Sequence, residues 1–252
     1  MASSDPLRRA MERRSKVLER RSIHVKMASM PKKTHRIARR TEALSRERIV
    51  AAAIDILDAG GEGALTVRAL AGRLATGSGA IYWHVADKNE MLAAAADEVI
   101  ARVITAVAGS KEPQEAIRAI ALGVFDAIDA HPWVGSQLFR EPWRPATLEI
   151  IESVSGQLHA LGGPRAAQFN SVTALLHYIL GVAGQNAANA RLVAPGTDRS
   201  AFLGSVAAQW TALDPAKYPF VRQMAAQLRD HDDREQFLAG VDLILAGITA
   251  VR

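Results

Sequence analysis

The chain has 252 residues, of which 49% are hydrophobic and 23% are charged. This balance is that of a folded globular protein and excludes bulk disorder, while the length allows one large domain or a small domain joined to a larger one. There is no cysteine, which excludes disulfides, thiolate nucleophiles and cysteine-based metal sites. No uninterrupted apolar run of about 18 residues is present, and the N-terminus lacks a secretory signal, so we expect a cytoplasmic protein without a membrane segment.

The first 44 residues form a basic arm. They hold 13 of the 31 Lys and Arg residues and 4 of the 26 Asp and Glu residues, a net charge of +9, whereas the rest of the chain has a net charge of −4. A basic arm suggests a polyanionic partner, and apolar residues between Leu7 and Leu18 are too sparse for a membrane-binding helix face, which favours nucleic acid. A solvated tail is the alternative, and Met27 and Met30 are alternative starts of translation.

Apolar residues after Ser45 recur at intervals of three and four, which predicts an all-α protein. Ser45 is a suitable N-cap for a first helix that reaches about Ala59, where a cluster of glycines ends it. Thr66 then caps a short second helix, whose apolar positions between Val67 and Leu74 follow helical spacing.

A three-residue break at 75–77 separates this helix from a third one, expected over residues 78–84. Asp87 and Glu90 have the spacing of a capping box, which predicts the start of a long fourth helix that reaches about residue 108. Three short helices therefore precede one long helix.

Prolines and glycines divide the rest of the chain into seven amphipathic segments, each expected to be a helix. The segments span residues 113–130, 132–139, 145–161, 164–190, 200–213, 216–230 and 233–251. We therefore predict a basic arm over 1–44, a three-helix domain over 45–92 with a connecting helix over about 87–108, and a larger helical domain over 109–252.

Two short helices joined by the 75–77 turn have the pattern of a helix-turn-helix, whose second helix enters the major groove of DNA. Its first turn would hold Ser78, Gly79 and Ala80, which are small enough to let the backbone approach the bases. No Asn, Gln or Arg occupies these positions, so hydrogen-bond reading of bases should be sparse there.

Polar side chains around this segment suit DNA phosphates and base edges. Tyr82 and His84 can hydrogen-bond phosphates, and Lys88 lies at a helix start that attracts phosphate. Arg68, in the first turn of the second helix, can reach a guanine edge or a phosphate. For Trp83 we favour packing in the core, since one residue of this triplet should face inward.

These residues resemble the DNA-binding signature of the TetR family of bacterial transcriptional regulators. The resemblance lies in LTVRALA at 65–71, AIYWHV at 80–85 and Lys88, and extends over residues 45–92. The Tyr-Trp-His triplet is similar to the tetracycline-repressor branch. The resemblance implies an all-α protein in which an N-terminal helix-turn-helix domain precedes a ligand-binding and dimerisation domain.

By the same resemblance, the protein is expected to be a homodimer that binds a palindromic operator in double-stranded DNA, usually as a repressor, and is released by a small-molecule effector. The expected DNA contacts share the surface of the second and third helices and the start of the fourth: Thr66, Arg68, Ser78, Gly79, Ala80, Tyr82, His84 and Lys88. The chain departs from the family at the turn, where Ala75 replaces the usual glycine. If that position is left-handed, alanine costs about 1–2 kcal/mol there.

A polar stripe lies on the helix expected over 164–190, where Asn170, Thr173, His177, Gly181 and Gly184 share helical spacing. The stripe either lines a ligand cavity, forms a dimer interface or belongs to a satisfied core. The cavity interpretation gives seven candidate effector-binding residues: Trp133, Phe139, Asn170, Thr173, His177, Gly181 and Trp210. Trp143 and Tyr178 are further candidates for the apolar wall.

Small residues on the helices expected over 164–190 and 233–251 favour dimerisation, because they allow helices to cross closely. They are Gly181, Ala183, Ala187, Gly240 and Gly247. Two such helices from each subunit would form a four-helix interface. Asp242, alone in an apolar run, is expected at a helix surface.

Two alternatives to a regulator remain open at this point. A protein that coats nucleic acid through the basic arm would bind without sequence preference. A helical enzyme is disfavoured, because the chain has no HExxH, GxSxG or P-loop motif. The seven histidines lack paired helical spacing, so we expect no catalytic residues, no metal site and no cofactor.

Overall fold

The computed structural model describes residues 44–109, 112–140, 143–163, 165–192 and 198–250, which fold into eleven α-helices and no strand. The all-α prediction is therefore confirmed for these residues. The basic arm before Leu44 lies outside the described residues, and so do the expectations about it.

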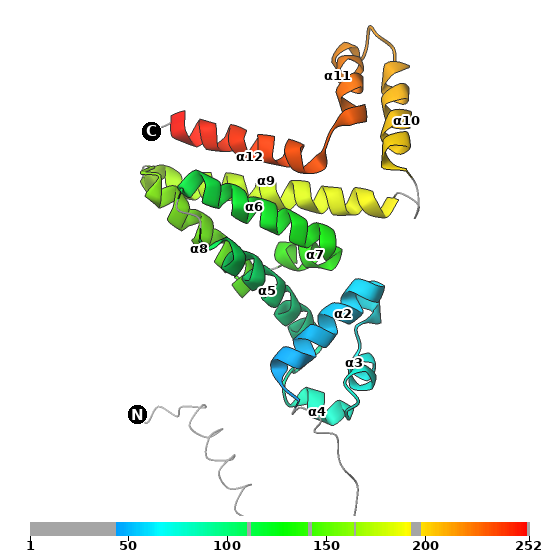
Figure 1. Ribbon diagram of the computed structural model, residues 1–252, viewed down its shortest axis with the longest axis vertical. Coiled ribbons are helices and arrows are strands. Elements are labelled where there is room, and N and C mark those ends of the chain that lie inside the picture. Colours follow the sequence, from blue (N-terminus) through cyan, green and yellow to red (C-terminus); the bar gives the residue numbers. More distant parts are fainter. Residues whose placement is uncertain (1–43, 110–111, 141–142, 164, 193–197, 251–252) are drawn as a thin grey trace, which may run out of the picture. The chain divides into compact units, whose positions relative to one another are not determined.

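Four helices make up the N-terminal part of the fold (Figure 1). They are α2 (Arg46–Ala64), α3 (Val67–Arg73), α4 (Ser78–Tyr82) and α5 (Lys88–Val107). Each expected cap forms: the backbone N–H of Arg48 donates to Ser45 Oγ, that of Ala69 to Thr66 Oγ1, and that of Glu90 to Asp87 Oδ1. These caps satisfy amides that a helix start leaves without a partner, which is why the helices begin where the sequence predicts.

The end of α2 differs from the prediction. The glycines do not stop the helix at Ala59; instead it continues to Ala64 across a kink at Gly61, whose φ is 67° and ψ is −172°. Only glycine adopts this backbone region without large strain. The residues after the kink form one further helical turn. This turn brings Glu62 into contact with α5 and α7 (Pro132–Arg140).

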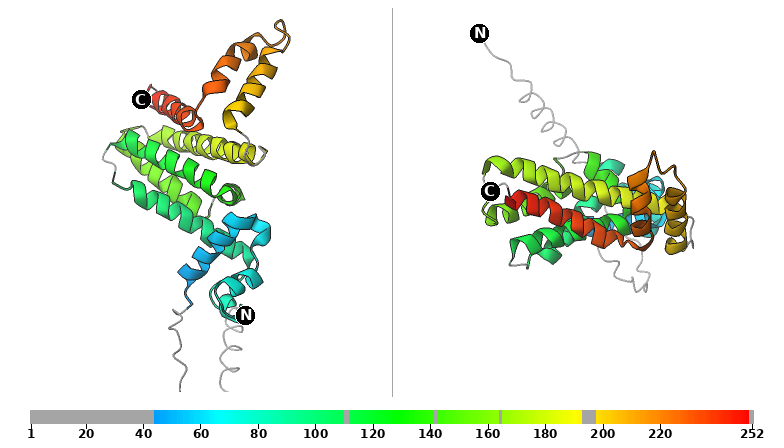
Figure 2. Two further views of the ribbon diagram at one scale, coloured as in Figure 1. Left: turned by 45° about the vertical axis from the view of Figure 1, so that its right-hand side comes forward. Right: turned by 90° about the horizontal axis from the view of Figure 1, so that it is seen from above.

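The C-terminal part contains seven helices. They are α6 (Pro113–Ala130), α7 (Pro132–Arg140), α8 (Pro145–Ala160), α9 (Arg165–Leu192), α10 (Arg199–Thr211), α11 (Pro219–Asp230) and α12 (Asp233–Ala250). Their bounds agree with the predicted segments within about three residues, because a proline in the first turn marks α6, α8 and α11. In Figures 1 and 2, α9 and α12 run side by side and the α10–α11 hairpin projects beyond them.

One hydrophobic core runs through both parts, here termed the head (residues 44–95) and the body (residues 112–250). Helix α5 packs on α2 in the head and on α6, α7 and α8 in the body. Within the body, the ring of Phe237 on α12 stacks on Phe125 of α6 at 4.7 Å and on Tyr178 of α9 at 5.7 Å between ring centroids. The long helices of the body are thus joined by aromatic contacts.

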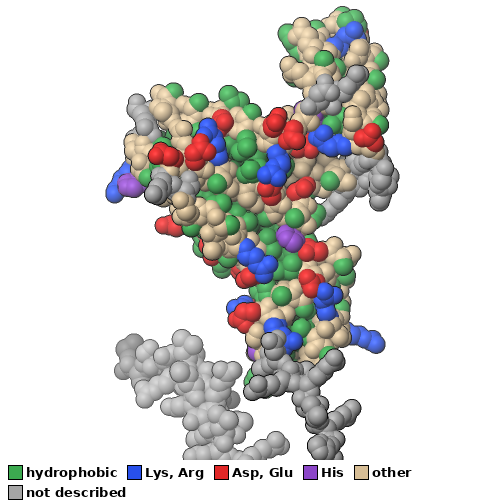
Figure 3. All heavy atoms as spheres, in the orientation of Figure 1, with side chains coloured by type: hydrophobic (Ala, Val, Ile, Leu, Met, Phe, Trp, Pro, Cys, Tyr) green, Lys and Arg blue, Asp and Glu red, His purple; other side chains and the backbone are tan. Residues whose placement is uncertain are grey.

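Charged side chains of both signs are interspersed over the face of the body in Figure 3. Asp242 lies at the surface, as predicted, where its Oδ1 accepts a hydrogen bond of 2.5 Å from Arg118 Nε on α6. Arg234 of α12 pairs with Asp126 of α6 in the same way. These exposed pairs align α12 with α6 and contribute little to stability individually.

Candidate nucleic-acid interface and body cavities

The turn between α3 and α4 contains a strained alanine. Ala75 has a φ of 50°, and it is the one non-glycine residue with positive φ among those described. The left-handed conformation considered for this position is therefore present, and its cost of about 1–2 kcal/mol applies. The C-terminal end of α3 is closed by the turn, because the N–H of Thr76 donates to the carbonyl of Ala71.

Ala75→Gly is expected to raise the free energy of unfolding by about 1 kcal/mol. Glycine removes the strain of the left-handed alanine, and part of that gain is lost because glycine increases the conformational entropy of the unfolded chain. Urea unfolding of both proteins at one concentration measures the difference. An unchanged or lower stability would show that the turn is not under strain.

Helix α4 is held by two side chains and exposes the others. Ile81 and Val85, four positions apart, are buried in the core, so the remaining positions face outward. The prediction that Trp83 packs in the core is wrong: 89% of its surface is exposed. Two positions along the helix correspond to about 200°, which places Trp83 on the side opposite the inward-facing Ile81.

The eight expected DNA-contact residues lie on α3, α4 and their flanks, all with some exposure to solvent. Most are exposed, and Ala80 and His84 are half-buried. Tyr82 stands beside the exposed Trp83 on the outer side of α4. The side chains expected to contact bases and phosphates are therefore available to a ligand, and Trp83 is an accessible aromatic residue that the sequence interpretation had placed elsewhere.

The side chain of Lys88, the first residue of α5, is held in place by a hydrogen bond. Its Nζ donates a hydrogen bond of 2.5 Å to the backbone carbonyl of Glu62, beyond the kink of α2. The ammonium group is otherwise exposed to solvent. The kinked end of α2 thus holds a cation at the amide-rich N-terminus of α5, where a phosphate would be favoured.

Two carboxylates of α2 receive hydrogen bonds from α7, which the sequence interpretation did not foresee. Asp58 Oδ1 accepts from Trp133 Nε1 at 2.8 Å and lies 2.7 Å from His131 Nδ1. Glu62 Oε1 accepts from Ser136 Oγ at 2.6 Å and from Gln137 Nε2 at 3.0 Å. The hydrogen bond from Ser136 is the largest influence on the pKa of Glu62, which is lowered although burial opposes the shift.

No local sequence pattern predicts the contacts of Asp58 and Glu62 with α7, because the partners are more than 70 residues apart in the chain. The available signal was the presence of the polar residues Ser136 and Gln137 in the otherwise apolar α7. The four-residue spacing of Asp58 and Glu62 does not place both carboxylates on one helical face, because the backbone leaves the helical conformation at Gly61 between them.

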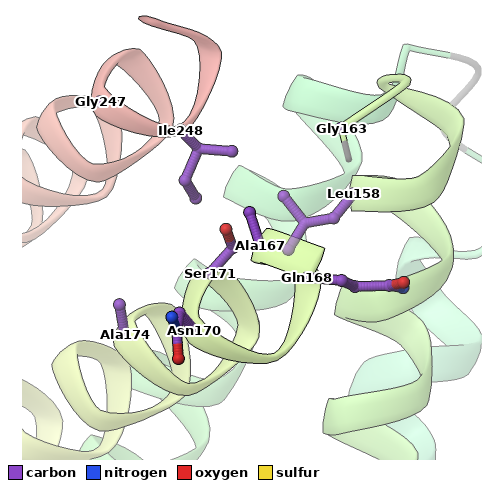
Figure 4. Close-up of a pocket in the computed structure, with 9 residues that line it drawn as sticks. All are labelled: Leu158, Gly163, Ala167, Gln168, Asn170, Ser171, Ala174, Gly247 and Ile248. Carbon is purple, nitrogen blue, oxygen red and sulfur yellow. The ribbon is translucent and has the colours of Figure 1, made fainter. Parts of the chain in front are cut away.

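The seven candidate effector-binding residues do not form one cluster. Trp133 is buried between α2 and α7, Trp210 lies on α10, and the exposed Phe139 lies beside Gly184. His177 and Gly181 are exposed on α9, and the half-buried Thr173 donates a hydrogen bond from Oγ1 to the carbonyl of Phe169. Trp143, suggested as a wall residue, is exposed, and Tyr178 packs between helices. Of the seven, Asn170 lines the cavity drawn in Figure 4.

That cavity has a volume of about 290 Å³ and lies among α8, α9 and α12 (Figure 4). The residues of its wall are mostly aliphatic or small, and three of them are polar: Gln168, Asn170 and Ser171. A second cavity of about 480 Å³ lies between α2 and α7, beside Asp58, Glu62 and Trp133. Trp133 therefore belongs to the junction of head and body, and Asn170 belongs to a cavity in the body.

The described residues lack two further features, a cluster of metal ligands and a helix that could span a membrane. They include no group of three or more His, Asp or Glu side chains placed to hold a metal ion. Within the same ranges, no helix combines the length and the apolar character needed to cross a membrane.

Family models match both parts of the chain. Residues 49–95 match the model described as "Bacterial regulatory proteins, tetR family", and residues 109–252 match "Tetracyclin repressor-like, C-terminal domain". An HTH-type transcriptional regulator of Saccharopolyspora erythraea is 31% identical over 139 residues, which are 55% of this chain and 59% of that protein. The tetracycline repressor protein class D of Escherichia coli is 30% identical over 213 residues, covering 81% of this chain and 88% of the repressor.

Solved structures agree with these matches. The transcriptional regulator SCO7222, a TetR from Streptomyces coelicolor, is 53% identical with a TM-score of 0.76, covering 82% of this chain and 99% of that one. ActR of the same organism, solved in complex with actinorhodin, shares the fold at 22% identity with a TM-score of 0.68, covering 83% and 97% of the two chains. With the helix-turn-helix geometry of α3 and α4 and the match of the larger C-terminal part, these findings show that the chain belongs to the TetR family of bacterial transcriptional regulators.

Proposed function

We propose that this DNA-binding regulator is a homodimeric repressor that recognises a palindromic operator and leaves it when a small molecule binds the body. The observation that carries the proposal is the build of α4. Ile81 fixes the helix to the core, while the slim surface of Ser78 and Gly79 stays exposed at its first turn. This arrangement suits entry of the α4 N-terminus into the major groove.

We assign recognition of bases to one side chain and binding of phosphates to several others. Arg68 is exposed in the first turn of α3 and carries the forked donor that suits a guanine edge. Tyr82, His84 and Lys88 suit phosphates, and Lys88 is already held at the start of α5 by the carbonyl of Glu62. Direct discrimination between bases should therefore depend mainly on Arg68.

Arg68→Ala is expected to cost about 1–3 kcal/mol on the preferred operator and to relax the preference at one base pair in each half-site. Lys88→Ala should weaken binding about equally on all sequences and lower the salt slope by about one unit per DNA-bound subunit. Footprinting on the upstream region of the gene identifies the operator, and titration of operator point variants at two salt concentrations separates the two effects.

Arg73→Ala is the matched control, because Arg73 is the last residue of the same helix and pairs with Asp55 of α2. It should retain the wild-type base preference. A discrete palindromic footprint supports the regulator with this mode of binding, whereas diffuse protection supports coating of nucleic acid. If Arg68→Ala weakens all sequences alike, Arg68 is a phosphate anchor and DNA shape provides the specificity.

The proposed dimer face lies on α9 and α12. On α9, the exposed positions His177 and Gly181 lie one helical turn apart on the same face. On α12, Leu243 has 75% of its surface exposed, and the residues from Phe237 onward are apolar or glycine apart from Asp242 and Thr249. A large apolar side chain among small residues on two adjacent long helices fits a four-helix interface between two copies of the chain.

For the effector, we propose the cavity among α8, α9 and α12. Its mostly aliphatic wall with few polar groups suits a small, largely apolar molecule, and the fold accommodates a small molecule in ActR. Binding there would favour a different separation of the two heads and so lower the affinity for the operator, with a coupling of about 1–3 kcal/mol.

Asn170→Ala is expected to change the response to an effector and to leave effector-free binding to the operator intact, because Asn170 lines the cavity and lies in the body. Asn189→Ala is the matched control, since Asn189 is exposed on the same helix and belongs neither to the cavity wall nor to the residues assigned to the dimer face. A panel of small apolar molecules is tested for release of labelled operator DNA. An equal response of both variants would place the effector elsewhere.

A further inference from the structure

We propose that Asp58 and Glu62 are positioning residues that hold each head against α7 and so set the separation of the two α4 helices in the dimer. The inference rests on the proposed dimer and operator. It concerns neither a DNA contact nor an effector contact: both carboxylates act through the helix that they bind.

The first attachment is Asp58. A single oxygen, Oδ1, accepts the indole N–H of Trp133 and faces His131 Nδ1, at the first turn of α7. Trp133 has only 4% of its surface exposed, so its ring is fixed by packing and its N–H has one direction. A fixed donor makes the position of Asp58, and with it the middle of α2, depend on α7.

The second attachment is Glu62, which follows the kink at Gly61. It accepts from Ser136 and from Gln137, and its Oε2 lies 3.3 Å from Arg140 Nη2. Gln137 is 2% exposed and is one of two buried polar side chains among the described residues. A buried amide that lost this carboxylate would keep only the longer contact of 3.4 Å to Ser136 Oγ, which makes separation of the head from α7 unfavourable.

The same residue connects α7 to the DNA-facing side of the head. The side chain of Glu62 binds α7, and its backbone carbonyl binds Lys88 Nζ at the start of α5. The kink at Gly61 is what turns this residue toward both partners. A displacement of α7 is therefore transmitted to a cation that we assign to a phosphate of the operator.

Helix α7 packs in turn on α6 and α9, two other helices of the body. A Cβ added at Gly135 would lie 3.4 Å from Ile128 Cγ2 of α6, and one added at Gly184 of α9 would lie 3.2 Å from the ring of Phe139. Because so little space remains between these helices, α7 has little freedom to slide independently of α6 and α9. Because α9 forms part of the proposed dimer face, α7 connects that face to the head as a short rigid element, here termed the strut.

The consequence for DNA is a fixed distance between half-sites. One base pair added between the half-sites displaces them by about 3.4 Å and rotates one relative to the other by about a tenth of a turn. A head that is held by both carboxylates cannot follow this change. A head released from α7 can follow it through bending at the junction.

A measurement without DNA tests the strut directly. The chain has no cysteine, so Gly72→Cys in the exposed surface of α3 provides one labelling site per subunit. Nitroxide labels there report the distance between the heads of the dimer by pulsed electron paramagnetic resonance. We expect a broader distance distribution for the full-length double variant Asp58→Asn/Glu62→Gln than for the wild-type protein.

Asp55→Asn is the matched control, because it removes a carboxylate from the same helix but one that pairs with Arg73 inside the head. It should keep the narrow distribution. Trp133→Phe serves as a second test variant if the double variant unfolds, since it keeps an aromatic ring in the core while it removes the N–H that binds Asp58 together with part of the ring volume. Equal widths in the wild-type protein and in both folded test variants overturn the proposal.

Operators with one or two base pairs inserted between the half-sites provide the second test. Couplings between sites commonly amount to about 5- to 150-fold, so we expect the wild-type preference for the native spacing to fall about fivefold or more in the double variant. An unchanged preference for the native spacing in the double variant overturns the proposal. Absence of a dipolar signal or of any operator footprint in the wild-type protein would instead refute the proposed dimeric regulator.

Discussion

Gly79→Leu is expected to abolish binding to the operator while leaving the fold and the oligomeric state unchanged. Gly79 is exposed in the first turn of α4, and a Cβ at this position would have no atom within 4 Å. The free protein therefore has space for the larger side chain. The major groove does not have this space, because a helix that reads base edges must bring its first turn close to them.

Loss of specific binding should amount to at least about 4 kcal/mol, the lower end of the usual difference between specific and non-specific DNA binding. Gel-shift titration at fixed salt measures the loss, and circular dichroism with light scattering verifies the fold and the size. Gly156→Leu on α8 is the control, since its Cβ also meets open space but lies on the body. Wild-type affinity of Gly79→Leu would mean that α4 does not enter the groove by this turn.

Gly240→Val is expected to destabilise the body by about 2–4 kcal/mol, from overpacking and from a lost hydrogen bond. A Cβ at Gly240 would lie 1.9 Å from Tyr178 Oη and 2.3 Å from its Cζ, which no packing tolerates. Tyr178 cannot move away without cost, because its ring stacks on Phe237 and its hydroxyl donates to the Phe237 carbonyl at 3.1 Å. Urea unfolding at one protein concentration measures the loss.

The cause of this loss can be isolated with a second variant. In a Tyr178→Ala background the obstruction is absent, so the double variant should lose about 1–3 kcal/mol less than the sum of the two single changes. Gly156→Ala, on an exposed and open helical position, should instead stabilise by up to about 1 kcal/mol. Additive losses at Gly240 and Tyr178 would show that the two positions do not meet.

Helix bounds were predictable because their causes are local. Ser45, Thr66 and Asp87 cap helices through side chains that bond amides three residues away, and prolines mark the starts of four body helices. The strain at Ala75 was recognised as a possibility because the family that the segment resembles usually has glycine at this position of the turn.

Features that depend on contacts distant in sequence were not predictable in this way. Trp83 was assigned to the core because one residue of the Tyr-Trp-His triplet was expected to face inward, but Ile81 and Val85 already occupy the inward side of α4. The bonds from α7 to Asp58 and Glu62 depend on how two helices more than 70 residues apart pack together. The dispersed positions of Trp133, Phe139 and Trp210 have the same origin, because hydrophobicity does not indicate which cavity a residue faces.

The passage of a single core through α5 limits how chimeric regulators can be built from this chain. Met91 and Leu92 at the start of α5 are buried in the head, and Ile100, further along the same helix, belongs to the same continuous core. If a chimera were joined inside α5, which is about 30 Å long, its head and its body would come from different proteins. The core residues of the two parts would then not fit against one another. Transplanting the operator preference of a relative therefore requires exchange of the whole of α5 together with the head, or of surface residues on α3 and α4 alone.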